Sequence, residues 1–162
     1  MSADVIRKEI LLRAPAARVW RALSDADEFG RWFGFRLDGQ FRPGAKMTGS
    51  IVGTQVDEEV RKAQKQHEGK RVELLIDRME PEKVFSFRWH PHAIDENKDY
   101  SAEPTTLVEF TMEQTHEGVK LTLTESGFEH IPLERRAQAF SSNDHGWSIM
   151  VPVFGKYIAR ES

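Results

Sequence analysis

The hydrophobic and polar positions predict that the chain begins with one strand and two short helices. Residues 4–13 alternate between apolar and polar side chains, which is typical of a half-exposed strand. The following segment, from Pro15 to Gly34, holds two short apolar faces at helical spacing and predicts two short helices. The second of these helices can be capped by Ser24, Asp25 or Asp27.

Six more strand-like runs follow, and short links between them favour antiparallel pairing. Along three of these runs the large apolar side chains share one face and polar side chains share the other. The apolar positions are Phe85, Phe87 and Trp89, then Val108, Phe110 and Met112, then Val119, Leu121 and Leu123. Residues 57–71 interrupt this pattern with a charged segment, which is expected to be a solvated excursion that can be helical.

The last part of the chain predicts a long helix. Its apolar residues recur in steps of three and four, with Asn143 in one place of the stripe: Phe140, Trp147, Met150, Phe154 and Tyr157 or Ile158. Gly146 and Pro152 weaken a helix at interior positions, so each needs a compensating role. A sheet with one apolar face and a long helix to cover it predicts a two-layer α+β fold, and we expect a single domain over 1–162.

Composition narrows the range of partners. The 162 residues carry a net charge of −3, which gives no broad basic field and argues against nucleic acid as a partner. There is no Cys, no apolar signal core at the start, and no apolar run near the roughly 18 residues that a membrane span needs. We therefore expect a soluble cytoplasmic protein, a monomer or a dimer, with no membrane insertion.

Four segments occur in an order that resembles a known family. They are APAARVWRALSDADEFGRWF, MEPEKVFSFRW, GVKLTLTESGF and the GW pair in the terminal helix. Together they are similar to activator of heat-shock protein 90 ATPase homologues, in the START-like (SRPBCC) helix-grip superfamily, over about residues 5 to 160. The resemblance implies a curved antiparallel sheet wrapped around a long C-terminal helix. It also implies a cavity between them, which many superfamily members use for apolar ligands.

Gly146 and Pro152 then allow two interpretations. Gly146 can leave open volume beneath the helix, while Pro152 bends the helix over a curved sheet. Alternatively, Gly146 only admits Trp20 or another large side chain into a filled core.

The candidate ligand-binding residues are the inward-facing ones nearest this helix, although each ring can equally belong to the core. They are Trp32, Phe87, Trp89, Phe110, Met112, Glu125, Asn143, Gly146, Trp147, Met150 and Phe154. Glu125 shares its strand face with Leu121 and Leu123, so it points toward the apolar side and can bind a ligand hydroxyl. A salt bridge with an arginine at the rim is the alternative for Glu125.

Catalytic and metal sites find less support in the sequence. His90 and His92 alternate on a predicted strand face, but no recognised metal-ligand spacing completes a site, and no metal or cofactor is predicted. Ser141, Ser142, Asp144 and His145 hold the residue types of a hydrolase triad without its nucleophile elbow. We assign no catalytic residue.

The leading hypothesis is noncatalytic binding of a small apolar molecule, aromatic or lipid-like. The first alternative is a chaperone accessory protein of the stress response, as the family name implies, although the resemblance covers only the second domain of the eukaryotic cochaperone. The second alternative is a cyclase-like or hydratase-like enzyme, in which Glu125 or His145 is the acid–base candidate. The expected partners are thus a small ligand or, in the first alternative, a chaperone.

Overall fold

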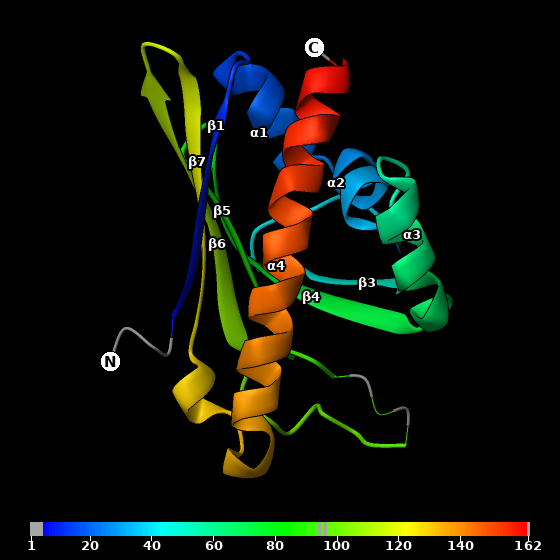
Figure 1. Ribbon diagram of the computed structural model, residues 1–162. Coiled ribbons are helices and arrows are strands. Elements are labelled where there is room, and N and C mark those ends of the chain that lie inside the picture. Colours follow the sequence, from blue (N-terminus) through cyan, green and yellow to red (C-terminus); the bar gives the residue numbers. More distant parts are fainter. Residues whose placement is uncertain (1–4, 94, 96, 162) are drawn as a thin grey trace.

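The computed structural model describes residues 5–93, 95 and 97–161. They form an α+β fold in which a seven-stranded sheet packs against a long C-terminal helix (Figure 1). The strands are β1 (Ile6–Leu12), β2 (Phe35–Leu37), β3 (Lys46–Ile51), β4 (Arg71–Glu80), β5 (Val84–Trp89), β6 (Thr106–Thr115) and β7 (Gly118–Ser126). The helices are α1 (Ala16–Ser24), α2 (Ala26–Phe33), α3 (Glu58–Gln64) and α4 (Leu133–Glu161), with short 3-10 helices η2 (Lys65–His67) and η3 (Phe128–His130).

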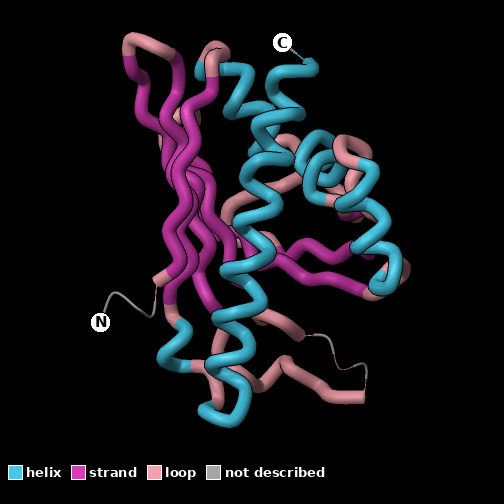
Figure 2. Tube along the Cα trace, in the orientation of Figure 1, coloured by secondary structure: helices cyan, strands magenta, loops and turns pink. Residues whose placement is uncertain are grey.

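The sheet is antiparallel throughout, in the order β1-β7-β6-β5-β4-β3-β2, which confirms the predicted pairing and the number of strands. A register shift between Ile76 and Arg78 marks a bulge in β4. Bulges bend and twist a strand, and Figure 2 shows that β3 and the adjoining half of β4 run across the direction of β1 and β7. The sheet therefore curls toward α4.

The two predicted helices follow β1, and of the three candidate caps for the second helix Asp25 is the one that caps it. The Asp25 carboxylate accepts a hydrogen bond from the Glu28 backbone N–H at 3.0 Å, which satisfies a free donor in the first turn of α2. Gly34 ends α2 with a φ of 97°, a left-handed conformation that favours glycine. A Cβ at Gly34 would lie 2.8 Å from the Thr54 backbone nitrogen, so close packing also requires glycine there.

The apolar stripe of α4 packs on the concave face of the sheet, as predicted. Its buried residues include Trp147, Met150, Val151, Val153, Phe154, Tyr157 and Ile158. The close approach between α4 and β1 lies at Gly155, where an added Cβ would be 2.7 Å from Ile10 Cδ1. Beyond the adjoining backbone of α4, an added Cβ at Gly146 would meet no atom within 4 Å, so the interpretation that Gly146 admits a large side chain is wrong.

Pro152 is exposed, on the side of α4 that faces away from the sheet. The hydrogen bond that its missing N–H would make is therefore lost at the solvated face, where water can satisfy the free carbonyl. Among the described residues no helix is long and apolar enough to cross a membrane.

A half-buried charge cluster joins α1, α2 and α4. Glu28 accepts hydrogen bonds from Arg18 at 2.9 Å, Arg21 at 2.7 Å and the Tyr157 hydroxyl at 2.8 Å. Burial by itself raises the pKa of Glu28, but the hydrogen bonds from Tyr157 and Arg21 and the charge of Arg18 bring the pKa below its ordinary value. This cluster ties the C-terminal half of α4 to the two short helices.

The charged segment at 57–71 forms α3 and η2, neither of which contains a fully buried residue. Asp57 caps α3 by accepting from the Val60 backbone N–H, and it pairs with Lys156 of α4 at 2.7 Å. The Gln64 side chain accepts from the Thr54 N–H and donates to the Phe33 carbonyl. The segment thus lies outside the core but is fastened to it.

Candidate functional site

Glu125 lies at the centre of a buried hydrogen-bond network between the sheet and α4. Its side chain is fully buried and accepts hydrogen bonds from four neutral side chains. We call Glu125 and these four residues the Glu125 network; the four are Trp89, Thr106, Asn143 and Trp147. Trp89 Nε1 donates at 2.8 Å, Thr106 Oγ1 at 2.6 Å, Trp147 Nε1 at 2.8 Å, and Asn143 Nδ2 lies 3.0 Å from both carboxylate oxygens. Four donors converging on two oxygens match the carboxylate form, which only accepts.

Strand register and helix spacing bring these residues together. Val108 of β6 pairs with Glu125 on one side and with Phe87 of β5 on the other. Thr106, two positions along β6 from Val108, is a diagonal neighbour of Glu125. Trp89 pairs with Thr106 and lies one strand further on the same face, from which its indole reaches Glu125. Asn143 and Trp147 are four residues apart on α4 and therefore project from one side of it.

The inward direction of Glu125 agrees with the strand alternation, but its partners differ from the salt-bridge alternative. That alternative required an arginine, whereas the donors are two indoles, a hydroxyl and an amide. A buried carboxylate is costly without compensation. Charge-assisted hydrogen bonds from neutral groups supply that compensation here.

An open cleft lies next to this network. It has a volume of about 770 Å³, and two network residues, Trp89 and Asn143, line it. Its remaining lining comes from β2, β3, β4, η2 and the segment that follows it, and the long connection between β5 and β6. Apolar lining residues are Phe35, Ile51, Val72 and Ala93, while polar ones include Thr48, His67, Lys70, His90, His92 and Tyr100.

Between β5 and β6, the described residues 90–93, 95 and 97–105 form one rim of the cleft, and part of this rim is held against the start of α4. Arg135 of α4 pairs with Glu103 at 2.7 Å and donates to the Pro91 carbonyl at 2.8 Å. The Arg135 guanidinium also lies over the Tyr100 ring, 4.8 Å from its centroid. The hydrogen bond from Arg135 and the charge of Lys98 help to lower the pKa of Glu103.

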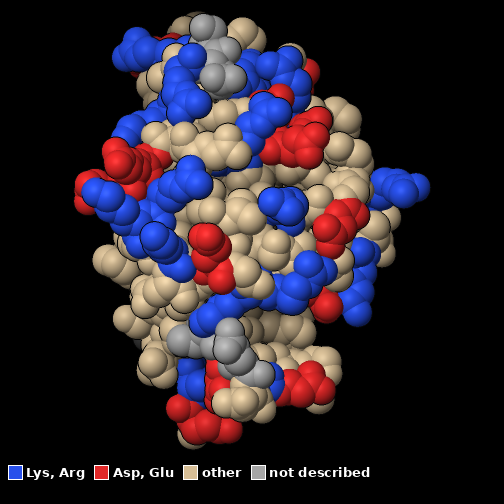
Figure 3. Space-filling model, turned by 90° about the vertical axis from the view of Figure 1, so that its right-hand side faces the viewer, with Lys and Arg blue, Asp and Glu red and all other residues tan. Residues whose placement is uncertain are grey.

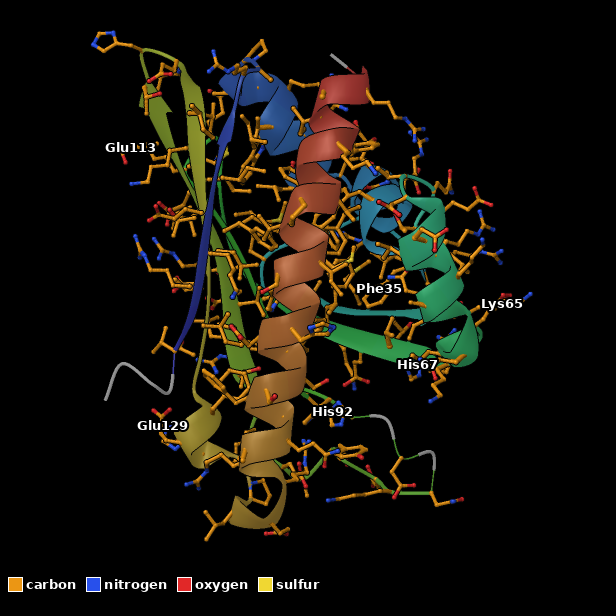
Figure 4. All side chains as sticks on the ribbon, viewed as in Figure 1. Phe35, Lys65, His67, His92, Glu113 and Glu129 are labelled. Carbon is orange, nitrogen blue, oxygen red and sulfur yellow. The ribbon has the colours of Figure 1, made fainter. Side chains whose placement is uncertain are left out.

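Two histidines approach the cleft from opposite rims, and Figure 4 labels both. His67, at the end of η2, receives a hydrogen bond from Lys70 Nζ to its Nδ1 at 3.0 Å. Burial and the charge of Lys70 lower the pKa of His67. Burial and the charge of Arg135 lower the pKa of His92. Both imidazoles are therefore held toward the neutral form.

The predicted ligand-binding residues are divided between this cleft and the core. Glu125 and Trp147 stand behind Trp89 and Asn143, and the indole rings of Trp89 and Trp147 are 5.9 Å apart. The rest do not line the cleft: Trp32, Phe87, Phe110, Met150 and Phe154 are buried, Met112 lies further along β6 and is half-buried, and Gly146 is half-buried on α4. Trp32 also satisfies its indole N–H within the core, on the Ala22 carbonyl at 3.0 Å.

The other chemical candidates are placed apart. His145 is exposed on α4 whereas Glu125 is buried beneath the helix, so these two acid–base candidates do not converge. The prediction that His90 and His92 share a strand face is wrong, because β5 ends at Trp89 and His92 has a φ of +51° in the turn that follows. In the described part of the chain, no three His, Asp or Glu side chains come together in a way that could hold a metal ion.

Several cleft residues were not predicted from the sequence. His67 and Lys70 follow a solvated helix, and Tyr100 lies in a polar connection, so none of them belongs to an apolar periodic stripe. The segments that carry them meet only because β4 and β5 are neighbours in the sheet. The unusual length of the two insertions, at 57–71 and after Trp89, is the one signal that marks them.

Comparison with known proteins agrees with this fold. No curated protein matches the chain. Crystal structures with a similar fold include protein MLL2253 from Mesorhizobium loti, with a TM-score of 0.70 and 19% identity over 98% of both chains. Protein CV1439 from Chromobacterium violaceum has a TM-score of 0.68 and 17% identity over 96% of both chains. CalU16 from Micromonospora echinospora has a TM-score of 0.59 and 21% identity over 97% of this chain and 76% of its own.

The family comparison covers nearly the whole fold. The model of the family described as "Activator of Hsp90 ATPase homolog 1-like protein" matches residues 13–159, from the end of β1 to the end of α4. The match includes every member of the Glu125 network and the cleft beside it. The chain therefore belongs to the Activator of Hsp90 ATPase homolog 1-like family and has its helix-grip fold.

Proposed function

We propose that this protein binds a small organic molecule, without chemical conversion, in the cleft beside the Glu125 network. The observation that carries the proposal is the cleft itself. Its volume of about 770 Å³ is in the range of small-molecule sites, and one wall offers the apolar side chains of Phe35, Ile51, Val72 and Trp89. An aromatic or lipid-like ligand suits such a wall.

The network supports binding by holding two lining residues in place. The indole of Trp89 is fixed by its hydrogen bond to Glu125, and Asn143 is fixed by the same carboxylate. A preorganised wall loses less conformational entropy when a ligand binds. The two lining residues thus present a rigid surface at the junction of sheet and helix.

The geometry also favours binding over catalysis by Glu125. Both of its oxygens are occupied by protein donors, and its side chain is closed from solvent. A general acid or base must come within hydrogen-bond distance of the group that it serves. Glu125 therefore acts on a ligand through the orientation of Trp89 and Asn143.

A matched pair of tryptophan substitutions on β4 tests this proposal. Val72 lines the cleft, whereas Leu75 is 44% exposed on the other face of the sheet. Fluorescence titration with the neutral probe N-phenylnaphthylamine should show saturable binding that Val72→Trp weakens by at least about tenfold and Leu75→Trp leaves unchanged. Equal effects of the two substitutions would show that the probe binds elsewhere.

The family description supports a second candidate, an accessory role toward a chaperone ATPase. The same two variants separate the candidates. Stimulation of the ATPase of heat-shock protein 90 that survives Val72→Trp would favour a docking surface outside the cleft. An absence of stimulation, together with probe binding that depends on Val72, favours the ligand-binding function.

A further inference from the structure

We propose that the cleft is built for an organic acid, whose anionic group is held by Lys70, which His67 orients, while its apolar body lies on the wall of Phe35, Ile51, Val72 and Trp89. This inference rests on the proposed function and adds the chemical class of the ligand. Lys70, His67 and the apolar residues all line the same cleft.

The contact with His67 orients the Lys70 ammonium group. An ammonium group only donates, so His67 Nδ1 accepts the bond from Lys70 Nζ and the ring carries its proton on Nε2. Lys70 keeps further N–H groups for a second acceptor. An anionic oxygen is the acceptor that best suits an ammonium group.

The other basic residues on the cleft are already paired with acids. Arg71 contacts Asp38 at 3.1 Å, and Lys98 contacts Glu103 at 2.9 Å. Lys70 differs, because its side-chain partner is the uncharged ring of His67, and no carboxylate in the described part of the chain lies within 4.0 Å of its nitrogen. Half-buried and without a carboxylate partner among the described residues, Lys70 is a cation that a ligand can neutralise.

The acidic residues on the cleft do not occupy this position. Glu73 is exposed and lies 3.6 Å from Lys46 on the neighbouring strand. Asp95 is exposed and accepts the Asn97 backbone N–H at 3.0 Å. On the connecting segment, the carboxylate of Glu103 is occupied by Lys98 and Arg135.

The two histidines of the cleft lie close to positively charged side chains. Besides burial, neighbouring positive charge lowers the pKa of both His67 and His92, although they come from different segments. Figure 3, which faces the side of the molecule that carries α3, shows Lys and Arg side chains spread across this surface with Asp and Glu between them. An incoming anion would be attracted to the cleft while its apolar part is buried against the wall.

Two probes that differ by one anionic group test the inference. Anilinonaphthalenesulfonate carries a sulfonate, whereas N-phenylnaphthylamine has a comparable ring system without it. We expect the wild-type protein to bind the sulfonate more tightly than the neutral probe. Lys70→Met should weaken sulfonate binding by about tenfold and change neutral-probe binding by less than about twofold, because one charged hydrogen bond is lost.

Lys65 supplies the matched control. It is an exposed lysine on η2 that does not line the cleft, and Figure 4 shows it pointing away from the helix toward solvent. Lys65→Met removes the same charge and should leave the binding of both probes unchanged, while Lys70→Arg should retain most of the sulfonate binding. Circular dichroism of each variant verifies that the fold is intact.

The outcomes separate this inference from the function on which it rests. If Lys70→Met weakens both probes equally, or Lys65→Met weakens the sulfonate as much as Lys70→Met does, recognition of the anion at Lys70 is refuted. In that case neutral-probe binding that depends on Val72 would still support the binding function. If neither probe binds the wild-type protein, the proposed function fails and the inference fails with it.

Discussion

Glu125→Gln is the substitution that most directly tests the buried network. Glutamine keeps the shape of the side chain but replaces one accepting oxygen with an amide NH₂, which donates. If the NH₂ takes the place of Oε1, it meets the indole N–H of Trp147; if it takes the place of Oε2, it meets that of Trp89. Thr106 can rotate its hydroxyl to accept, but an indole N–H cannot. Either orientation therefore leaves one indole donor without an acceptor.

The expected cost follows from this geometry. An unpaired buried donor costs about 1 to 3 kcal/mol, and the remaining bonds to Glu125 lose the contribution of its charge. Relief of the burial of a charge offsets part of that loss. We expect a destabilisation of about 3 kcal/mol, which for a domain of this size lowers Tm by about 6 to 12 °C.

Urea unfolding followed by circular dichroism measures the change in the free energy of unfolding. Glu109→Gln is the matched control, because Glu109 lies on the other face of β6 and only approaches Arg78 at 4.0 Å, so its loss should cost less than about 0.5 kcal/mol. The indole proton resonances of Trp89 and Trp147 should shift in the Glu125 variant alone. Equal stability of the two variants with unmoved indole resonances would refute the network as a stabilising element.

Three further predictions concern the helix, the charge cluster and the cleft rim. In urea unfolding, Gly146→Ala should raise the free energy of unfolding by about 1 kcal/mol, because alanine is the better helix former. Gly155→Ala should show no such increase, because its Cβ would lie too close to Ile10. The pKa of Glu28 is lowered in the fold, so the stability that it adds is present above its unfolded value of 4.5 and disappears as pH falls through the folded value. The Tm of Glu28→Gln should accordingly change less across acidic pH than the Tm of the wild-type protein. Arg135→Met should speed limited proteolysis within residues 90–105 by about tenfold, because the rim loses its anchor on α4.

Local patterns predicted most of the fold because the elements are amphipathic and clearly bounded. The alternation along β5, β6 and β7 identified the buried face, and the steps of three and four in α4 identified the side that packs on it. Capping chemistry, which depends on a few neighbouring residues only, limited the start of α2 to Ser24, Asp25 or Asp27, and Gly34 marked its end. In these elements local preference and tertiary packing agree.

The site was only partly predictable. The inward direction of Glu125 follows from alternation, but its partners depend on the register between β5, β6 and β7, which the residues of one strand do not specify. The cleft was harder still, since His67 and Tyr100 lie in polar segments without periodicity. Their meeting is a property of the sheet order and could not be derived from spacing along the chain.

The Glu125 network also limits which strand pairings the protein can adopt. Glu125 lies in β7, between β1 and β6, and it faces Ile6 on one side and Val108 on the other. Strand side chains alternate, so a slip of one residue would turn Glu125 outward and move Thr124 or Ser126 into its place. The slipped sheet would bury two indole N–H groups without a carboxylate, whereas a purely apolar face could tolerate the shift at lower cost. The buried charge thus selects a single alignment of the central strands against α4.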